Sequence, residues 1–270
     1  LRTARTPNID TLIEEGKLFT NTEILGDRPT KNDTVSGPGW TSFLTGVWAD
    51  KHGIQDNSFK GINVDQYPHF FARVREHFPK ARLGSFVDWH PIDKHVVRDA
   101  DVRISLESHS VDQYREHDQK LAAAAADFLS SGQPHAAMVY FGAADEAGHA
   151  KGFHPSVPTY ITAIETIDGL VGKLVDAVKS RPQYESENWL VVLSTDHGGR
   201  GTGHGGGHDV PEIRRTWLIA SGRSMGQPTT EATYVVDVAA TALSHLGVPI
   251  DPEWQLDGKP VVAAADPQEP

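Results

Sequence analysis

Apolar residues alternate along the chain between short continuous runs and longer helical stretches. The runs at 136–141, 189–193 and 215–220 are short and rich in β-branched and aromatic residues, which is typical of strands buried on both faces. Apolar residues recur at helical spacing in 157–178, and 111–129 carries a continuous alanine run; both stretches are predicted helices. Strands that alternate with helices indicate a mainly parallel sheet covered on both faces. We therefore expect an α/β fold, a three-layer αβα sandwich.

Caps and glycine stops predict the shorter elements. The expected helices are 6–16, 38–46, 68–78 and 234–246, and the expected strands are 17–24 and 82–89. Residues 94–109 show no clear pattern, and no element is assigned to them. The chain has no internal repeat, linker or low-complexity segment, so we expect a single domain over residues 1–270.

Composition excludes several classes of protein. The 270 residues are 38% hydrophobic and 23% charged, and 36 acidic against 25 basic side chains give a net charge of −11. This charge repels long polyanions and argues against a nucleic-acid polymer as partner. The chain has no cysteine, which excludes disulfides, thiolate ligands and a cysteine nucleophile. No apolar stretch approaches the ~20 residues of a membrane span, and we expect no targeting segment; compartment and oligomeric state stay open.

Two of the predicted strands end in an aspartate and a histidine. Asp196 and His197 directly follow one buried run. Asp145 follows another, with His149 four residues later, and His204 lies in the glycine-rich loop after the first pair. Ligands of open α/β sheets bind at the carboxyl ends of strands, and mixed oxygen and nitrogen donors suit zinc or a similar divalent ion. The alternative, a flexible glycine turn with incidental histidines, is less favoured because the Asp–His pair stands at the strand end.

A serine near the start of the chain is the candidate nucleophile. Ser36 lies at a predicted tight turn, and a helix is expected to open at Pro38. Free backbone N–H groups at a helix N-terminus favour an anion there. The alternative is that Ser36 only caps the helix. Thr34, ahead of the turn, and Ser42, inside the helix, are poorer candidates.

The five acidic and imidazole side chains are enough for most of two tetrahedral metal sites. Two metal ions roughly 4 Å apart can clamp the attacking and leaving oxygens of an in-line displacement at phosphorus. A metal ion can also lower the pKa of a serine hydroxyl so that it attacks as an alkoxide.

Motifs that carry this chemistry resemble the alkaline phosphatase superfamily, particularly its nucleotide pyrophosphatase/phosphodiesterase branch. The resembling segments cover nearly the whole chain in the family's order: 6–12, 36–46, 51–54, 145–149, 194–198, 203–206, 236–239 and 247–249. Each segment alone is a weak signal, whereas their order and spacing together are a strong one.

The resemblance implies a core sheet that carries two divalent metal ions, with zinc as the expected metal. The ligands of one ion match Asp145, His149 and His204. Ligands of the other, which also contacts the nucleophile at Ser36, match Asp196 and His197.

The implied reaction is hydrolysis of a phosphodiester or pyrophosphate bond in a small, nucleotide-like substrate. Ser36 is expected to attack phosphorus and form a phosphoseryl intermediate. A phosphomonoesterase or sulfatase on the same scaffold is the near alternative. A non-catalytic relative that binds a metal and a phosphoester is another.

The sequence departs from the family pattern at three places. The family's second metal site takes a further aspartate from a strand before the first helix, and we expect that first strand to be missing from this sequence. Sulfatases carry arginine where Trp40 stands, which counts against sulfate esters. The phosphodiesterase branch often has asparagine where Gly39 stands, so substrate must be held by other groups.

Four residues are candidates for substrate contact: Trp40, Gly37, Trp89 and His208. The two tryptophans can stack on a ring of the substrate, or they can pack in the core. A backbone N–H such as that of Gly37 can hold a phosphate oxygen. His208, four residues after His204 across a glycine spacer, is expected to contact substrate or support a ligand.

Overall fold

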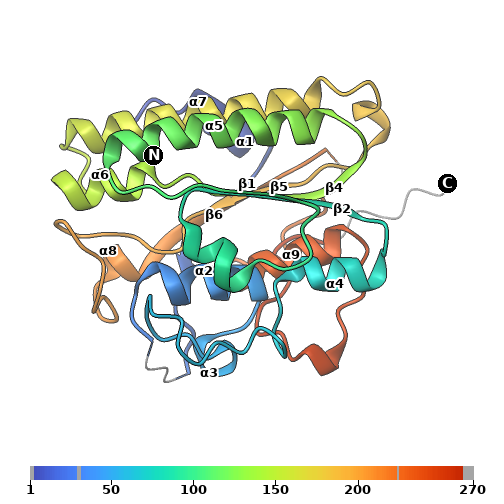
Figure 1. The fold of residues 1–270 in the computed structure, drawn as a ribbon, viewed down its shortest axis with the longest axis horizontal. Helices are drawn as coiled ribbons and strands as arrows, with labels where there is room; N and C mark the ends of the chain where they lie inside the picture. The colour runs from blue at the N-terminus through green and yellow to red at the C-terminus, as the bar shows by residue number, and fades with distance from the viewer. Residues whose placement is uncertain (1–2, 29–31, 224, 264–270) are drawn as a thin grey trace. The chain divides into compact units, whose positions relative to one another are not determined.

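The structure is a computed structural model that describes residues 3–28, 32–223 and 225–263. The chain divides into two compact units, each built from separate segments. Unit 1 comprises residues 1–11, 80–187 and 199–203, and unit 2 comprises residues 12–79, 188–198 and 204–270. Figure 1 labels their elements. A single domain over the chain stays a prediction, and the two units are described one at a time.

Unit 1 contains a parallel sheet with strand order β3-β2-β4. Its strands are β2 (Arg82–Val87), β3 (Val102–Ser105) and β4 (Pro134–Val139). The strands predicted at 82–89 and 136–141 are confirmed, and β3 lies in the stretch to which no element was assigned. Parallel strands end at one edge of a sheet, so the segments that follow β2 and β4 emerge at the same edge.

Helix α5 packs on this sheet, and α7 packs on α5 and α6. The helices are α1 (Pro7–Glu14), α5 (Val111–Ser130), α6 (Ala143–Lys151) and α7 (Pro158–Lys179), with a π-helical turn at Ile92–Val96 and a 3-10 turn at Tyr184–Ser186. In Figure 1, α5 and α7 run side by side. The alanine run of α5 allows this helix to pack closely on β2 and β4, with Ala122 and Ala125 fully buried. Both long helices match their predicted ranges to within a residue or two.

The sheet of unit 2 has strand order β1-β6-β5 and is antiparallel. Its strands are β1 (Gly16–Glu23), β5 (Val191–Ser194) and β6 (Arg215–Ser221). The connection from β5 to β6 carries only the short helix α8 (Pro211–Arg214), without a helix that packs on the sheet as a parallel crossover does. The α/β class is confirmed, while the described strand pairs are parallel in unit 1 and antiparallel in unit 2. The side chains of β5 are half-buried, not fully buried as predicted.

The helices of unit 2 lie mostly near their predicted positions. They are α2 (Ser36–Thr45), α3 (Ala49–His52), α4 (Phe70–His77), α8 and α9 (Asp237–His245), with a 3-10 turn at Pro252–Trp254. Helix α2 ends at Gly46, which has a left-handed φ of 76°. It begins at Ser36, two residues before the predicted opening at Pro38, because Val35 is the extended residue that precedes the first turn. Among the described residues, no helix combines the length and the apolarity that a membrane crossing requires.

Candidate functional site

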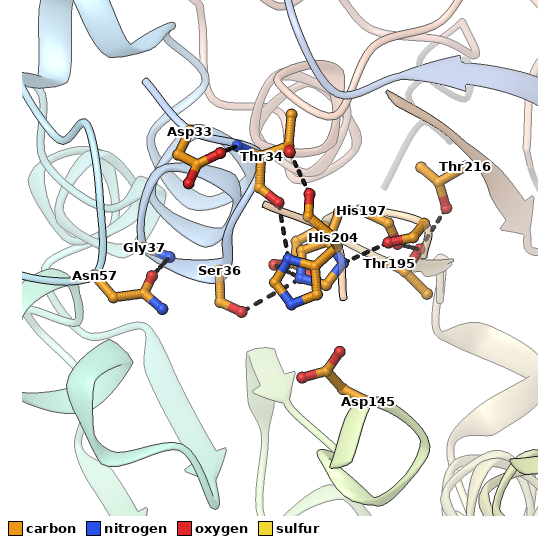
Figure 2. Close-up of polar contacts among 12 residues, drawn as sticks. Asp33, Thr34, Ser36, Gly37, Asn57, Asp145, Thr195, His197, His204 and Thr216 are labelled. Carbon is orange, nitrogen blue, oxygen red and sulfur yellow. Dashed lines mark hydrogen bonds and ion pairs between the residues drawn. The ribbon is translucent and has the colours of Figure 1, made fainter. Parts of the chain in front are cut away.

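The candidate nucleophile lies in the first turn of α2, in unit 2. Ser36 is a helical residue, and Val35 occupies the N-cap position with no side-chain capping bond; the alternative that Ser36 is only a cap is therefore wrong. The Ser36 side chain is buried, and its Oγ lies 3.4 Å from Nε2 of His197 (Figure 2). The segment that follows β5 thus brings an imidazole to the predicted nucleophile.

Asp196 and His197 follow β5 directly, as predicted, and both are buried. An Asp196 carboxylate oxygen lies 3.4 Å from Nε2 of His197. Helix α2 approaches this pair at Gly39, where an added Cβ would stand 3.0 Å from both Cβ and Oδ2 of Asp196. The glycine at this departure from the family pattern therefore provides the space that the carboxylate occupies.

His204 joins the same cluster within unit 2. Its ring stacks on that of His197, with centroids 3.7 Å apart and planes inclined by 21°. Nδ1 of His204 lies 2.8 Å from the backbone oxygen of Thr34, and Nδ1 of His197 lies 2.9 Å from that of Gly198. A ring that donates its Nδ1–H to a carbonyl carries its lone pair on Nε2.

Asp145 and His149 form a second pair, in unit 1. Helix α6 spaces them by four residues, so they share a helix face, with the carboxylate 3.5 Å from Nε2 of His149. Nδ1 of this histidine lies 3.0 Å from the backbone oxygen of Thr202. The hydrogen bond with Asp145 raises the pKa of His149 to about 9.

The three histidines have one feature in common that fits a metal ion. In each ring Nδ1 is bound to a backbone carbonyl, which is the usual support of a histidine ligand because it orients the ring and increases the basicity of Nε2. Two carboxylates accompany them. Imidazole nitrogen with carboxylate oxygen is a donor set of zinc, so the residues present fit the expected metal.

One residue beside the nucleophile helix, Asn57, is not among the site candidates that the sequence indicates. Asn57 accepts a hydrogen bond at Oδ1 from the backbone N–H of Gly37, at 2.6 Å. Because Gly37 follows Ser36, this bond fixes the Asn57 amide beside the first turn of α2 (Figure 2). Asn57 lies three residues beyond the segment 51–54 and belongs to no motif, so only the folded chain reveals it.

The other substrate candidates occupy varied positions. Trp40 is buried in α2, with its ring 5.0 Å from that of Phe43, the packing that the core alternative predicts. Trp89, in unit 1, is half-buried after β2. His208 is half-buried, and its backbone oxygen accepts a hydrogen bond from Arg214. A substrate role for these three side chains stays a prediction.

The middle of the chain matches a known protein family. Residues 73–205 match the family model described as type I phosphodiesterase / nucleotide pyrophosphatase. The matched segment, 133 of the 270 residues, is similar to a family of the alkaline phosphatase superfamily. The superfamily predicted from the motifs is thereby confirmed, and its match indicates a hydrolase of the phosphodiesterase or sulfatase type that depends on metal. The matched range includes the four aspartate and histidine ligand candidates of both strand ends and His204, whereas Ser36 lies before it.

Solved structures of superfamily members share the fold. BT1596, described as a 2-O GAG sulfatase, is 15% identical and has a TM-score of 0.69, covering 95% of this chain and 70% of its own. Ps i-CgsB is 19% identical with a TM-score of 0.68, over 95% and 69% of the two chains. Human ectonucleotide pyrophosphatase/phosphodiesterase 5 is 14% identical with a TM-score of 0.64, over 92% and 91%. No curated protein matches the sequence significantly.

Proposed function

We propose that this protein hydrolyses a phosphodiester or pyrophosphate bond of a small, nucleotide-like substrate, with Ser36 as nucleophile. The observation that supports this most is the position of Ser36 in the first turn of α2, with its Oγ 3.4 Å from Nε2 of His197. The N-terminus of α2 offers a favourable dipole to a phosphoryl group, while the N–H groups of Gly37 and Gly39 are bonded to Asn57 and Val35. The family match to phosphodiesterases supports the substrate class.

We further propose that the chain binds two zinc ions. The assignment follows the resemblance: Asp145, His149 and His204 for one ion, and Asp196 and His197 for the other. The backbone carbonyl at Nδ1 of each histidine supports it, because it leaves Nε2 as the donor atom. When bound, zinc lowers the pKa of a hydroxyl and offsets the charge that develops on phosphoryl oxygens.

In the proposed reaction, Ser36 Oγ forms a bond to phosphorus as the bond from phosphorus to the leaving oxygen breaks. The leaving alcohol or phosphate departs, and the remaining group is held as a phosphoseryl ester. Water then attacks phosphorus, releases the phosphomonoester and regenerates the Ser36 hydroxyl. Asn57 supports this scheme, because Gly37 binds its Oδ1 and its Nδ2 amide protons are donors suited to a phosphoryl oxygen.

Substitution of Ser36 tests the nucleophile. We expect Ser36→Ala to reduce hydrolysis of bis-p-nitrophenyl phosphate by at least about 1,000-fold, since loss of a nucleophile removes the covalent route. Ser36→Thr is the matched control, because it keeps a hydroxyl at the same position and should keep measurable hydrolysis and covalent phosphate after acid quench. An alanine variant that hydrolyses the diester as fast as the parent rules out Ser36 as nucleophile.

Relative rates on three substrates test the reaction class. The diester should be hydrolysed faster than p-nitrophenyl phosphate and p-nitrophenyl sulfate. Trp40, which stands where sulfatases carry arginine, counts against sulfate. Fastest hydrolysis of the sulfate would favour a sulfatase. Metal content of one ion per chain with no turnover of any of the three would favour a non-catalytic binding protein.

A further inference from the structure

The glycine-rich loop after His204 is attached to the two residues that lead into the nucleophile helix. These residues, Asp33 and Thr34, belong to unit 2 together with His204–Gly207. Val35, which follows them, is extended, and α2 begins at the next residue. Figure 2 shows Thr34 and His204 facing each other along this contact.

Thr34 holds His204 at both its ring and its main chain. Its hydroxyl donates a hydrogen bond to the backbone oxygen of His204, and its own backbone oxygen lies 2.8 Å from Nδ1 of the ring. The same hydroxyl accepts a hydrogen bond of 2.8 Å from the backbone N–H of Gly207. Thr34 is only 2% exposed, so water does not compete strongly for these bonds.

Asp33 holds the middle of the loop. Its Oδ1 accepts hydrogen bonds from the backbone N–H of Gly206, at 2.6 Å, and from that of Thr34, at 2.7 Å. Carboxylate acceptors make stronger bonds to backbone N–H groups than neutral acceptors do. The side chains of Asp33 and Thr34 therefore bind the loop at three residues, His204, Gly206 and Gly207.

The glycines of the loop permit this close approach. An added Cβ on Gly207 would stand 2.9 Å from the Thr34 hydroxyl and 2.3 Å from Cγ2 of Ile213. Gly206 has a left-handed φ of 64°. Glycine allows the close approach at residue 207 and the left-handed φ at residue 206. Glycine also loses more conformational freedom than other residues when its backbone is ordered, so the loop needs contacts from outside to hold one conformation.

We propose that Asp33 and Thr34 are positioning residues that fix His204 for metal binding and couple it to the helix of Ser36. This inference rests on the proposed function, because it treats His204 as a ligand. We call the two residues the 33–34 clasp. By ordering the carbonyl of His204 and the two glycines at 206 and 207, the clasp keeps the ring where Nδ1 donates to Thr34 and Nε2 remains the donor atom.

Zinc affinity of Thr34 variants, measured by competition with a chromophoric chelator, tests the clasp. Thr34→Val keeps the shape of the side chain and removes the hydroxyl, so zinc affinity should fall about 10- to 100-fold, the usual cost of losing support to a ligand. Thr34→Ser restores the hydroxyl and should restore most of the affinity. Thr45→Val is the matched control, because the buried Thr45 hydroxyl bonds only to a carbonyl within α2 and its loss should leave affinity unchanged.

The ring itself supplies a readout that does not depend on hydrolysis. In the zinc-free protein, the Nδ1 proton of His204 should give a slowly exchanging NMR signal in the parent and the Thr34→Ser variant, and exchange faster in Thr34→Val. An unchanged signal together with unchanged zinc affinity overturns the proposal. If the parent fails to hydrolyse the diester, the proposed function fails, while the proton exchange still decides whether the clasp orders the ring.

Asp33→Ala keeps the inference testable if Thr34→Val does not fold. Asp33 is half-buried, and its removal deletes the anchor at Gly206 without opening a cavity at Thr34. We expect about 10-fold weaker zinc binding and faster proton exchange at His204. Zinc affinity equal to that of the parent overturns the role of Asp33 in the clasp.

Discussion

Asn57 is a surface residue that one hydrogen bond places beside the first turn of α2. Its side chain belongs to an exposed residue, yet its Oδ1 is fixed 2.6 Å from the backbone nitrogen of Gly37. Asparagine in this orientation supplies donors, which aspartate lacks. The identity of the residue therefore matters as much as its position.

Replacing Asn57 tests whether its amide stabilises the transition state. We expect Asn57→Ala to lower kcat for the diester by about 100-fold, as loss of one donor to a developing charge does. Asn57→Asp keeps an acceptor for Gly37 but replaces the donors by a negative charge, so it should be at least as inactive. Asn63→Ala is the control, because the Asn63 amide bonds to Gln66. Full activity in Asn57→Asp would contradict the donor role.

Gly39 is the residue at which α2 meets Asp196. A methyl group there would contact Cβ and Oδ2 of Asp196 at 3.0 Å, so Gly39→Ala should displace the carboxylate and weaken zinc binding measured by chelator competition. Gly169→Ala in α7 is the control, since an added Cβ meets nothing within 4 Å and alanine should stabilise the helix by about 0.5–1 kcal/mol. Zinc affinity that is equal in both variants would show that the contact at Gly39 is unimportant.

At the scale of elements, α6 receives its N-terminal cap from another helix. Its N-cap residue is Gly142, which has no side chain, and Asp118 of α5 accepts from the backbone N–H groups of Gly142 and Ala143 at 3.0 and 3.3 Å. Asp118 interacts electrostatically with Asp88, which follows β2, and both residues are fully buried. Burial, followed by the charge of Asp118, raises the pKa of Asp88 to about 10, and burial raises that of Asp118 to about 6.

Unfolding in urea tests this cap. Asp118→Ala leaves the N–H groups of Gly142 and Ala143 without their acceptor, so we expect a loss of about 3 kcal/mol in the free energy of unfolding. Asp88→Asn should cost less than about 1 kcal/mol, because a neutral amide replaces a carboxyl whose pKa burial raises. Asp127→Ala, at an exposed position of α5, is the control. Equal losses in the Asp88 and Asp118 variants would contradict the capping role of Asp118.

Sequence patterns predicted the elements that have a strong period and missed those that do not. Helix α7 has apolar residues at helical spacing and was found within two residues. Helix α6 has the sequence AADEAGHAK, which contains no large apolar side chain and gives no amphipathic period, so it was missed although its aspartate and histidine were recognised. Strand β3 has only four residues, too few for alternation to stand out.

Candidate ligands were predictable because they follow predicted strands in the sequence. The residues after a strand lie at its carboxyl end, which is where ligands of α/β sheets bind. Asn57 and Thr34 were not, since their roles depend on contacts across 20 and 170 positions of sequence. The start of α2 was misplaced because Pro38 is a common first helical residue, whereas the extended Val35 sets the boundary. Local signals therefore indicate candidate donors, and tertiary contacts determine which groups orient these side chains.

For the molecule as a whole, buried ionisable groups make stability depend on pH in two opposite ways. Burial lowers the pKa of His52 and of His69 to about 3, so the unfolded chain binds more protons below about pH 6.5 and these groups destabilise the fold as pH falls. Burial raises the pKa of Asp237 to about 6; its contribution is present at low pH and is lost as pH rises through 6. Above pH 6.5 these three groups no longer distinguish the folded from the unfolded chain.

The alkaline range isolates Asp88, whose folded pKa of about 10 lies far above that of the unfolded chain. The folded protein holds this proton where the unfolded chain has released it, so the free energy of unfolding should fall as pH rises above 6.5. The groups that face Asp88 are Asp118 and Tyr114, and burial raises the pKa of Tyr114 above its ordinary value.

His149, whose pKa is raised to about 9 by Asp145, also loses its contribution to stability as pH rises from 6.5 to 9. Because His149 is present in parent and Asp88→Asn variant alike, the difference between their urea-unfolding free energies cancels it. That difference should shift in favour of the variant as pH rises, and parallel curves would show that Asp88 is already ionised in the folded protein.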